Sequence, residues 1–170
     1  MNLKPRKILG WALVIAFSLI PIAASAFSVK EIQTKAKLPN SNWTWDKEYS
    51  GNDVLVGMYV TQAGRAVSIR ANYYDYPYTP KRYLEGVREK LMEKSEYKGG
   101  EFHLPEEKTI GSKTWAYFKL KRLDGINQEL WSLKDPNGQV LFIIYTTAGD
   151  DYFNKYYPDF SNFISQISNM

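Results

Sequence analysis

The strongest constraint on the fold is a run of six apolar residues, VLFIIY, at positions 140–145. Such a run has no polar face, so as a strand it requires other parts of the chain to cover it on both sides. A strong turn precedes it in the segment 135–138 (DPNG), where proline presets φ and glycine tolerates positive φ. The run therefore predicts a central strand of a sheet.

Two further strands are predicted just before this run, which gives a three-stranded meander. Residues 114–121 alternate, with Ala116, Phe118 and Leu120 on one face of the predicted strand. Asp124-Gly125 supplies a turn, and residues 128–133 form the next strand.

The first half of the chain predicts a hairpin. Residues 43–45 begin a strand, and two β-rich runs at 54–62 and 66–74 flank the turn at 63–65. In the second run four residues share one face, namely Val67, Ile69, Ala71 and Tyr73. The polar residues between them share the other face. We expect the hairpin to bury the first of these faces.

Two helices are predicted, while residues 27–42 are expected to be a polar lead-in. The first helix has Thr79 as its N-cap and Pro80 at its first position. Its apolar stripe consists of Leu84, Val87 and Leu91.

In the C-terminal segment we expect Asp150 or Asp151 to cap a short first piece and Pro158 to restart the helix. A stripe of Phe160, Phe163, Ile164 and Ile167 then follows. The order of elements indicates an α+β fold, a mostly antiparallel β-sheet with helices packed on it.

Residues 1–26 have the pattern of a cleavable signal peptide. Three basic residues, Lys4, Arg6 and Lys7, precede an uncharged apolar run at 8–20, and Pro21 and Ala24-Ser25-Ala26 follow. The alternative is a permanent membrane anchor, but the run is shorter than the ~20 residues that a spanning helix needs. We therefore expect cleavage after Ala26, a single domain at 27–170, a periplasmic or secreted location, and only transient membrane contact through the signal.

Composition excludes several classes of function. Removal of residues 1–26 leaves 19 basic and 18 acidic residues, so the mature chain has no electrostatic basis for binding nucleic acid. The sequence contains no cysteine, which rules out disulfides, thiol catalysis and thiolate metal ligands.

Several features together resemble the Mog1/PsbP-like fold family, which includes the periplasmic DcrB-like proteins. They are spread over most of the mature chain: Leu38-Pro39 before Trp43, the hairpin leading to Pro80, Ile110-Gly111 before Trp115-Ala116-Tyr117, Tyr152-Phe153 and Tyr156 before Pro158, and the final stripe at 160–167. The resemblance implies an α-β-α sandwich.

It also implies a non-enzymatic accessory or binding role. Photosynthetic members help retain ions at photosystem II, and others bind protein partners. The resemblance supplies no site residue, because no functional motif matches. The lipidation cysteine of several bacterial members is absent here.

The sequence offers few candidate catalytic or metal-binding residues. His103 is the only histidine, in a polar stretch at 99–108 that is expected to be a loop. One histidine without cysteine does not suffice for most zinc sites, and no nucleophile motif accompanies it. We expect no catalytic residue, no cofactor and no metal ligand.

Two pairs of neighbouring carboxylates are not expected to act as catalytic dyads. On a strand, the two members of Glu106-Glu107 would point to opposite faces. Asp150-Asp151 is expected to cap a helix, and a calcium site there is the alternative. The DPNG segment matches only a fragment of an EF-hand loop and is interpreted as a turn.

The most unusual feature is the tyrosine-rich stretch 72–83 (NYYDYPYTPKRY). Tyr73 should be core, because it continues the apolar face of its strand, whereas Tyr74 lies on the opposite face. Tyr76 and Tyr78 flank Pro77 in a predicted surface loop. We interpret Tyr74, Tyr76 and Tyr78 as a partner-facing surface, since tyrosine suits wet interfaces. Packing of these rings under the helix is the alternative.

Two functional hypotheses remain. The first is an exported non-enzymatic binding or accessory protein that contacts a protein partner in the cell envelope. The second is a weak hydrolase or a small-ligand or calcium-binding protein that uses His103 or a carboxylate cluster. A pocket that joins His103 to two acids would favour the second hypothesis, and an exposed aromatic patch would favour the first.

Overall fold

The computed structural model describes residues 29–49, 55–135 and 137–170. The predicted signal peptide and its cleavage site lie outside these ranges and stay predictions. Within the described ranges no helix is both long and apolar enough to cross a membrane.

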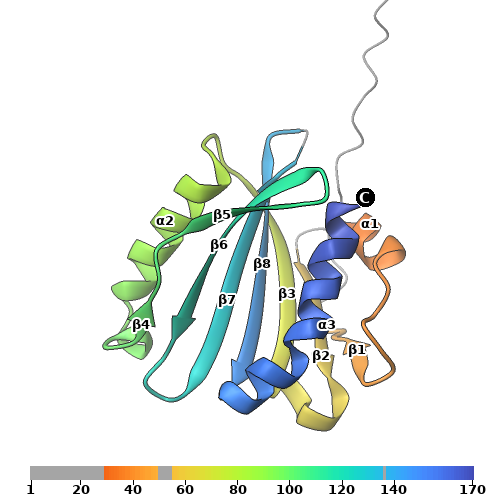
Figure 1. Cartoon of the computed structure of the whole chain (residues 1–170), viewed down its shortest axis with the longest axis horizontal. Coiled ribbons are helices and arrows are strands. Elements are labelled where there is room, and N and C mark those ends of the chain that lie inside the picture. Colours follow the sequence, from red (N-terminus) through yellow and green to blue (C-terminus); the bar gives the residue numbers. More distant parts are fainter. Residues whose placement is uncertain (1–28, 50–54, 136) are drawn as a thin grey trace, which may run out of the picture.

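An antiparallel sheet of eight strands forms the centre of the fold (Figure 1). Its order is β1-β2-β3-β8-β7-β6-β4, and β5 also pairs with β6. The strands are β1 (Trp43–Trp45), β2 (Leu55–Val60), β3 (Val67–Asp75), β4 (Glu101–Phe102), β5 (Glu106–Ile110), β6 (Lys113–Lys121), β7 (Ile126–Lys134) and β8 (Gln139–Ala148). The predicted fold class is confirmed.

The apolar run at 140–145 lies in β8, near the middle of the sheet, as its composition predicts. Ile143 pairs with Ala71 of β3 on one side and with Trp131 of β7 on the other. The turns of the meander depend on glycine, since Gly125 has φ of 84° and Gly138 has φ of 87°. The hairpin between β2 and β3 is also present, joined by a short 3-10 segment, η1 (Thr61–Ala66).

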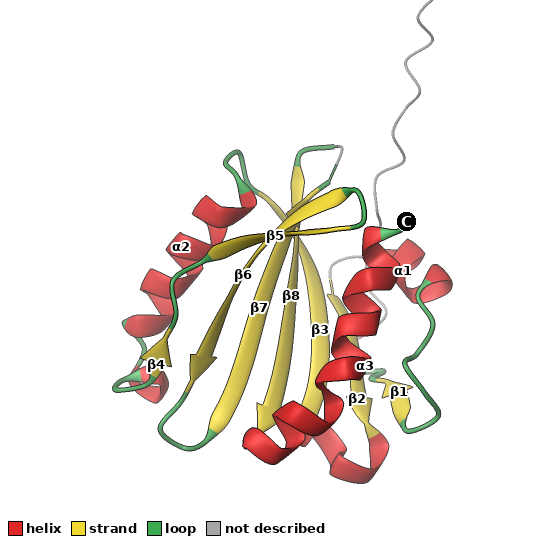
Figure 2. Ribbon diagram, viewed as in Figure 1, coloured by secondary structure: helices red, strands yellow, loops and turns green. Residues whose placement is uncertain are grey.

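Helices cover both faces of the sheet and make a three-layered α-β-α sandwich (Figure 2). On one face α1 (Val29–Lys35) and α3 (Asp150–Ser168) enclose the larger core. On the other face α2 (Pro80–Met92) packs on β6 and β7, and the short η2 (Ser95–Tyr97) follows it. Alternation along β8 serves both cores, because Leu141, Ile143 and Tyr145 face α3 while Phe142 faces α2.

Helix α2 begins as predicted. The hydroxyl of Thr79 accepts a hydrogen bond from the backbone N–H of Arg82, and Pro80 occupies the first turn. Leu84 of the predicted stripe is completely buried against the sheet, and Val87 and Leu91 pack beside it.

The predicted start and interruption of the C-terminal helix are wrong. Helix α3 is continuous from Asp150 to Ser168 with Pro158 inside it, and its N-cap is Gly149 without any side-chain cap. Proline removes one backbone hydrogen bond locally, but Tyr156 and Phe160 on either side are both buried in the larger core. Burial of these two rings outweighs one lost bond.

Two segments expected to be irregular also form regular structure. The polar lead-in contains α1, which is held to the core by Ile32, a fully buried side chain. The polar stretch around His103 contains β4 and β5, which pair with β6 along opposite halves of that strand. The side chains of β5 are almost all exposed, so the strand shows no apolar alternation that a sequence pattern could reveal.

Candidate functional site

The tyrosine-rich stretch gathers where the end of β3 meets the start of α2. Tyr74 is the last but one residue of β3, Tyr76 and Tyr78 lie in the connecting loop, and Tyr83 is in the first turns of α2. Tyr73 points to the opposite face and packs against the larger core, as predicted.

The rings form one continuous aromatic cluster. Tyr76 lies edge-to-face against both Tyr78 and Tyr83, with ring centroids 5.4 Å and 5.0 Å away. Tyr83 in turn meets Phe142 of β8 at 5.4 Å, and Tyr74 is 5.7 Å from Tyr83. Contacts of this geometry contribute about 0.5–1.5 kcal/mol per pair beyond area burial. The cluster is therefore an ordered part of the fold.

A groove of about 460 Å³ runs along α2 beside this cluster. Phe142 lies on the face of β8 that packs toward α2, and it provides the apolar floor next to Val87 and Leu91. We call this the tyrosine groove, and its lining is Tyr74, Asp75, Tyr76, Tyr83, Gly86, Val87, Lys90, Leu91, Lys94 and Phe142.

Of the three predicted surface residues, Tyr74 and Tyr76 line the tyrosine groove, whereas Tyr78 packs on Tyr76 outside the lining. Tyr78 is 61% exposed and Tyr74 is 39% exposed, while Tyr76 is half-buried. The cluster thus has one buried side, where Tyr83 packs, and one side that meets solvent.

Polar contacts hold the tyrosine loop in place. The ammonium of Lys134 donates to the backbone carbonyls of Pro77 and Tyr78, at 3.4 Å and 3.5 Å. The side-chain amide of Asn72 donates to the hydroxyl of Tyr74 at 2.8 Å. Burial raises the pKa of Tyr83 far above the ordinary tyrosine value, so its hydroxyl stays neutral at physiological pH.

The charged rim of the groove is uneven. Lys90 and Lys94 are exposed at the end of α2, and neither forms an ion pair with another described residue. Asp75 follows Tyr74 directly and therefore lies at the tyrosine end, where its carboxylate accepts a hydrogen bond from Gln139. Of the charged residues that line the groove, the two lysines therefore lie at the end away from the loop.

His103 has few neighbouring groups that could support catalysis. Its side chain is exposed, its backbone N–H bonds to the carbonyl of Lys119, and its own carbonyl accepts from Arg88. The shallow hollow of about 220 Å³ beside it contains a single carboxylate, that of Glu106, which already accepts a hydrogen bond from the hydroxyl of Tyr117. The combination of His103 with two acids that would favour a hydrolase is not found among the described residues.

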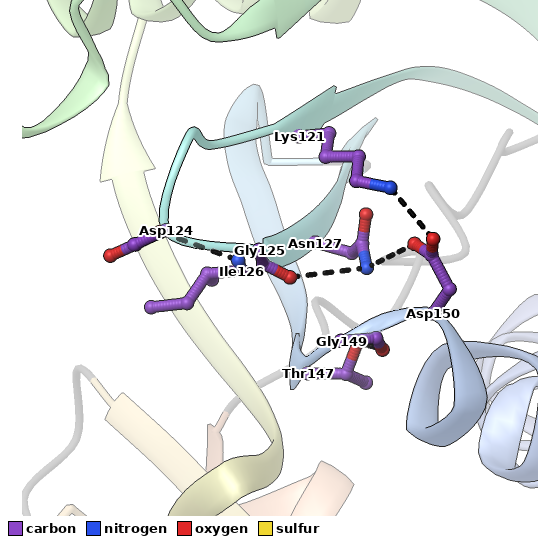
Figure 3. Close-up of polar contacts among 8 residues, drawn as sticks. All are labelled: Lys121, Asp124, Gly125, Ile126, Asn127, Thr147, Gly149 and Asp150. Carbon is purple, nitrogen blue, oxygen red and sulfur yellow. Dashed lines mark hydrogen bonds and ion pairs between the residues drawn. The ribbon is translucent and has the colours of Figure 1, made fainter.

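Of the two carboxylate pairs, Glu106-Glu107 is divided between the faces of a strand, whereas Asp150 and Asp151 line one hollow at the start of α3. Glu106 and Glu107 are consecutive residues of β5, where neighbouring side chains alternate between faces. Asp150 connects the start of α3 to the β6–β7 turn. Lys121 and Asn127 each donate a hydrogen bond to one carboxylate oxygen of Asp150, at 2.7 Å and 2.9 Å (Figure 3). The hydrogen bond from Lys121 is the main reason that the pKa of Asp150 is lowered.

Each oxygen of Asp150 accepts one of these hydrogen bonds, and Asp151 is the one other described carboxylate that lines the same hollow. Among the described residues no group of three or more histidine, aspartate and glutamate side chains is placed to hold a metal ion.

Sequence reasoning missed the most deeply buried of the acidic residues that the structure describes. Glu129 of β7 is completely buried under α3, where Oε1 accepts hydrogen bonds from Trp131 and Tyr157, at 2.9 Å and 3.1 Å. Its position could have been noticed, because Glu129 shares the strand face of Trp131 and Leu133, both of which are apolar.

The fold that results is the Mog1/PsbP-like fold, with an antiparallel sheet between α1 and α3 on one face and α2 on the other. The structure is similar to the solution structure of cyanobacterial PsbP (CyanoP) from Synechocystis sp. PCC 6803, with a TM-score of 0.53 and 13% sequence identity. The match covers 74% of this chain and 81% of that chain. No protein-family model and no curated protein sequence matches the chain. At this level of identity the similarity establishes the fold and carries no function with it.

Proposed function

We propose that this chain is an exported, non-enzymatic binding or accessory protein that contacts a protein partner in the cell envelope through the tyrosine groove. The signal-like pattern at 1–26 supports export to the periplasm or beyond. The scarcity of catalytic groups at His103 and at the carboxylate pairs supports a binding role over a chemical one.

One observation carries this proposal. An ordered cluster of tyrosines exposes Tyr74 and Tyr78 to solvent, directly beside a groove with an apolar floor. Rigid amphipathic rings lose little conformational entropy on binding, and as interface anchors each contributes upwards of ~2 kcal/mol.

The experiment is capture of partners from the native envelope extract by the purified chain. Tyr76 and Tyr78 are replaced together by serine, and Tyr152→Ser serves as the matched control. Tyr152 is 38% exposed on α3, on the opposite face of the sheet, and it also stacks on a neighbouring ring. We expect the double variant to lose the captured protein and the control to retain it.

Thermal unfolding is measured on the same samples. Loss of capture by a double variant that still unfolds cooperatively, within a few degrees of the wild type, supports the groove as the contact surface. Equal capture by both variants would contradict the proposal. Unfolding of the double variant under native conditions would show that these rings serve as core.

A further inference from the structure

We propose that the partner segment in the tyrosine groove is an extended peptide with an aromatic or large aliphatic anchor and an acidic residue three or four positions away. This inference rests on the proposed function and names the chemistry of the occupant. It follows from the shape of the groove, from its charge and from its length.

The anchor follows from the walls and floor at the tyrosine end. Tyr74 and Tyr83 both contact the ring of Phe142, with ring centroids 6.1 Å and 5.4 Å away, and Val87 lies in the same cluster. A surface made of ring faces and a branched aliphatic side chain offers few polar partners. It therefore favours an apolar group, and an aromatic ring adds edge-to-face contacts.

The acidic residue follows from the lysine end. Lys90 and Lys94 present two ammonium groups without an ion-pair partner among the described residues, and the groove's acidic residue, Asp75, lies at the other end. A carboxylate near the lysines gains favourable contacts, while a cationic residue is repelled. Because exposed pairs contribute only about 0–1 kcal/mol each, the lysines determine which peptide binds more than how tightly it binds.

The spacing follows from helix geometry. Tyr83 and Lys90 are seven residues apart on α2, which corresponds to roughly 10 Å at a rise of 1.5 Å per residue. An extended peptide rises about 3.3 Å per residue, so about three residues span that distance. The helix ends at Met92, roughly 14 Å from Tyr83, which about four extended residues span, and Lys94 lies two residues beyond that end.

The test is a selection of random nine-residue peptides displayed on phage against the purified chain. Three variants are selected in parallel: Lys90→Glu with Lys94→Glu, Tyr74→Ser with Tyr76→Ser, and Lys155→Glu as a charge-reversal control on α3. We expect the wild type and the control to enrich peptides that carry an aromatic residue and an acidic residue three or four positions apart. The reversed variant should enrich the same anchor with a basic residue instead.

The remaining outcomes would overturn the inference in different ways. Peptides that depend on Tyr74 and Tyr76 but show no acidic preference would overturn this inference and leave the proposed function standing. Failure of the wild type to enrich any peptide would overturn the peptide as occupant. Two further occupants are checked directly: tyrosine-dependent dimerisation in sedimentation would indicate a second copy of the chain, and tyrosine-dependent co-sedimentation with phosphatidylglycerol vesicles would indicate a lipid surface. Either result would overturn the inference.

Discussion

The ammonium nitrogen of Lys119 lies 3.7 Å from Oε2 of Glu129, a carboxylate oxygen that is buried without a hydrogen-bond donor among the described residues. The lysine side chain is itself 45% exposed and reaches over the rings of Phe153 and Tyr157. The pair joins β6 to β7, and the hydrogen bond from Tyr157 to Glu129 joins both strands to α3. The link is polar in the middle of an otherwise apolar layer, so its energy depends on the protonation of Glu129.

Acidification should stabilise the folded chain through Glu129, although it removes the charge that attracts Lys119. Burial raises the pKa of Glu129, and it outweighs the lowering effects of Lys119 and of the hydrogen bonds from Trp131 and Tyr157. Because the folded chain holds the proton more tightly than the unfolded chain, the stabilising effect is complete below the ordinary glutamate pKa. It is lost as the pH rises through the folded pKa.

The comparison of wild type with Glu129→Gln isolates this effect, because the other carboxylates are common to both. Glutamine keeps an oxygen to accept from Trp131 and Tyr157, and it removes the titration. Urea unfolding from pH 4 to 8 should show the wild type losing stability relative to the glutamine variant as pH rises. A wild type that gains stability relative to the variant over this range would show that the pair with Lys119 dominates.

The end of α3 offers a test of buried hydrogen bonding. The indole N–H of Trp115 donates to the hydroxyl of Ser168 at 2.8 Å, and that hydroxyl donates to the carbonyl of Ile164, all in buried surroundings. Ser168→Ala leaves the indole N–H without its acceptor, which should lower the free energy of unfolding by about 1–3 kcal/mol. Ser161→Ala at an exposed position of the same helix should change it by no more than about 0.5 kcal/mol. Equal effects in urea unfolding would contradict the assigned contact.

Two glycines should respond to alanine in opposite directions. At Gly86, inside α2, a Cβ atom would meet nothing closer than the hydroxyl of Tyr76 at 4.0 Å, so alanine should stabilise the helix by about 0.5–1 kcal/mol. At Gly57 of β2, a Cβ atom would lie 2.7 Å from the Cβ of Tyr49, so alanine forces a shift that costs about 1–3 kcal/mol. Melting temperatures of the two variants that move in the same direction would refute this assignment.

The parts of the fold that the sequence predicts are those whose pattern is local. The run at 140–145 has no polar face, and Thr79-Pro80 begins a helix by direct backbone chemistry, so β8 and α2 could be foreseen. In contrast, β5 is exposed on nearly all its positions, and α1 is a short helix held to the core by the side chain of Ile32, so neither carries a periodic signal. The prediction that Pro158 interrupts the C-terminal helix was wrong for a related reason. Burial of the neighbouring side chains outweighed the local tendency of proline to end a helix.

The residues of the tyrosine groove also divide into those that a local sequence pattern reveals and those that only the folded arrangement reveals. Tyr74 and Tyr76 could be selected because five tyrosines in twelve residues are unusual and a proline loop predicts exposure. The floor of the groove could not be selected, because Phe142 reaches Tyr74 only through the pairing of β3 with β8, which are far apart along the chain. The contribution of Lys90 and Lys94 depends on the same non-local arrangement, since without the sheet beside them they are ordinary exposed lysines.

Gly86→Leu tests the groove as a binding surface most directly, because it fills the groove without removing any residue of the tyrosine cluster. Gly86 lines the groove in the interior of α2, where leucine is a strong helix former. The measurement is the fluorescence anisotropy of the peptide most enriched by the wild type, titrated with wild type, Gly86→Ala and Gly86→Leu, alongside their melting temperatures. We expect Gly86→Leu to melt no lower than the wild type and to bind the peptide at least tenfold more weakly, with Gly86→Ala in between. A folded Gly86→Leu variant that binds as tightly as the wild type would contradict the claim that the tyrosine groove is the binding surface.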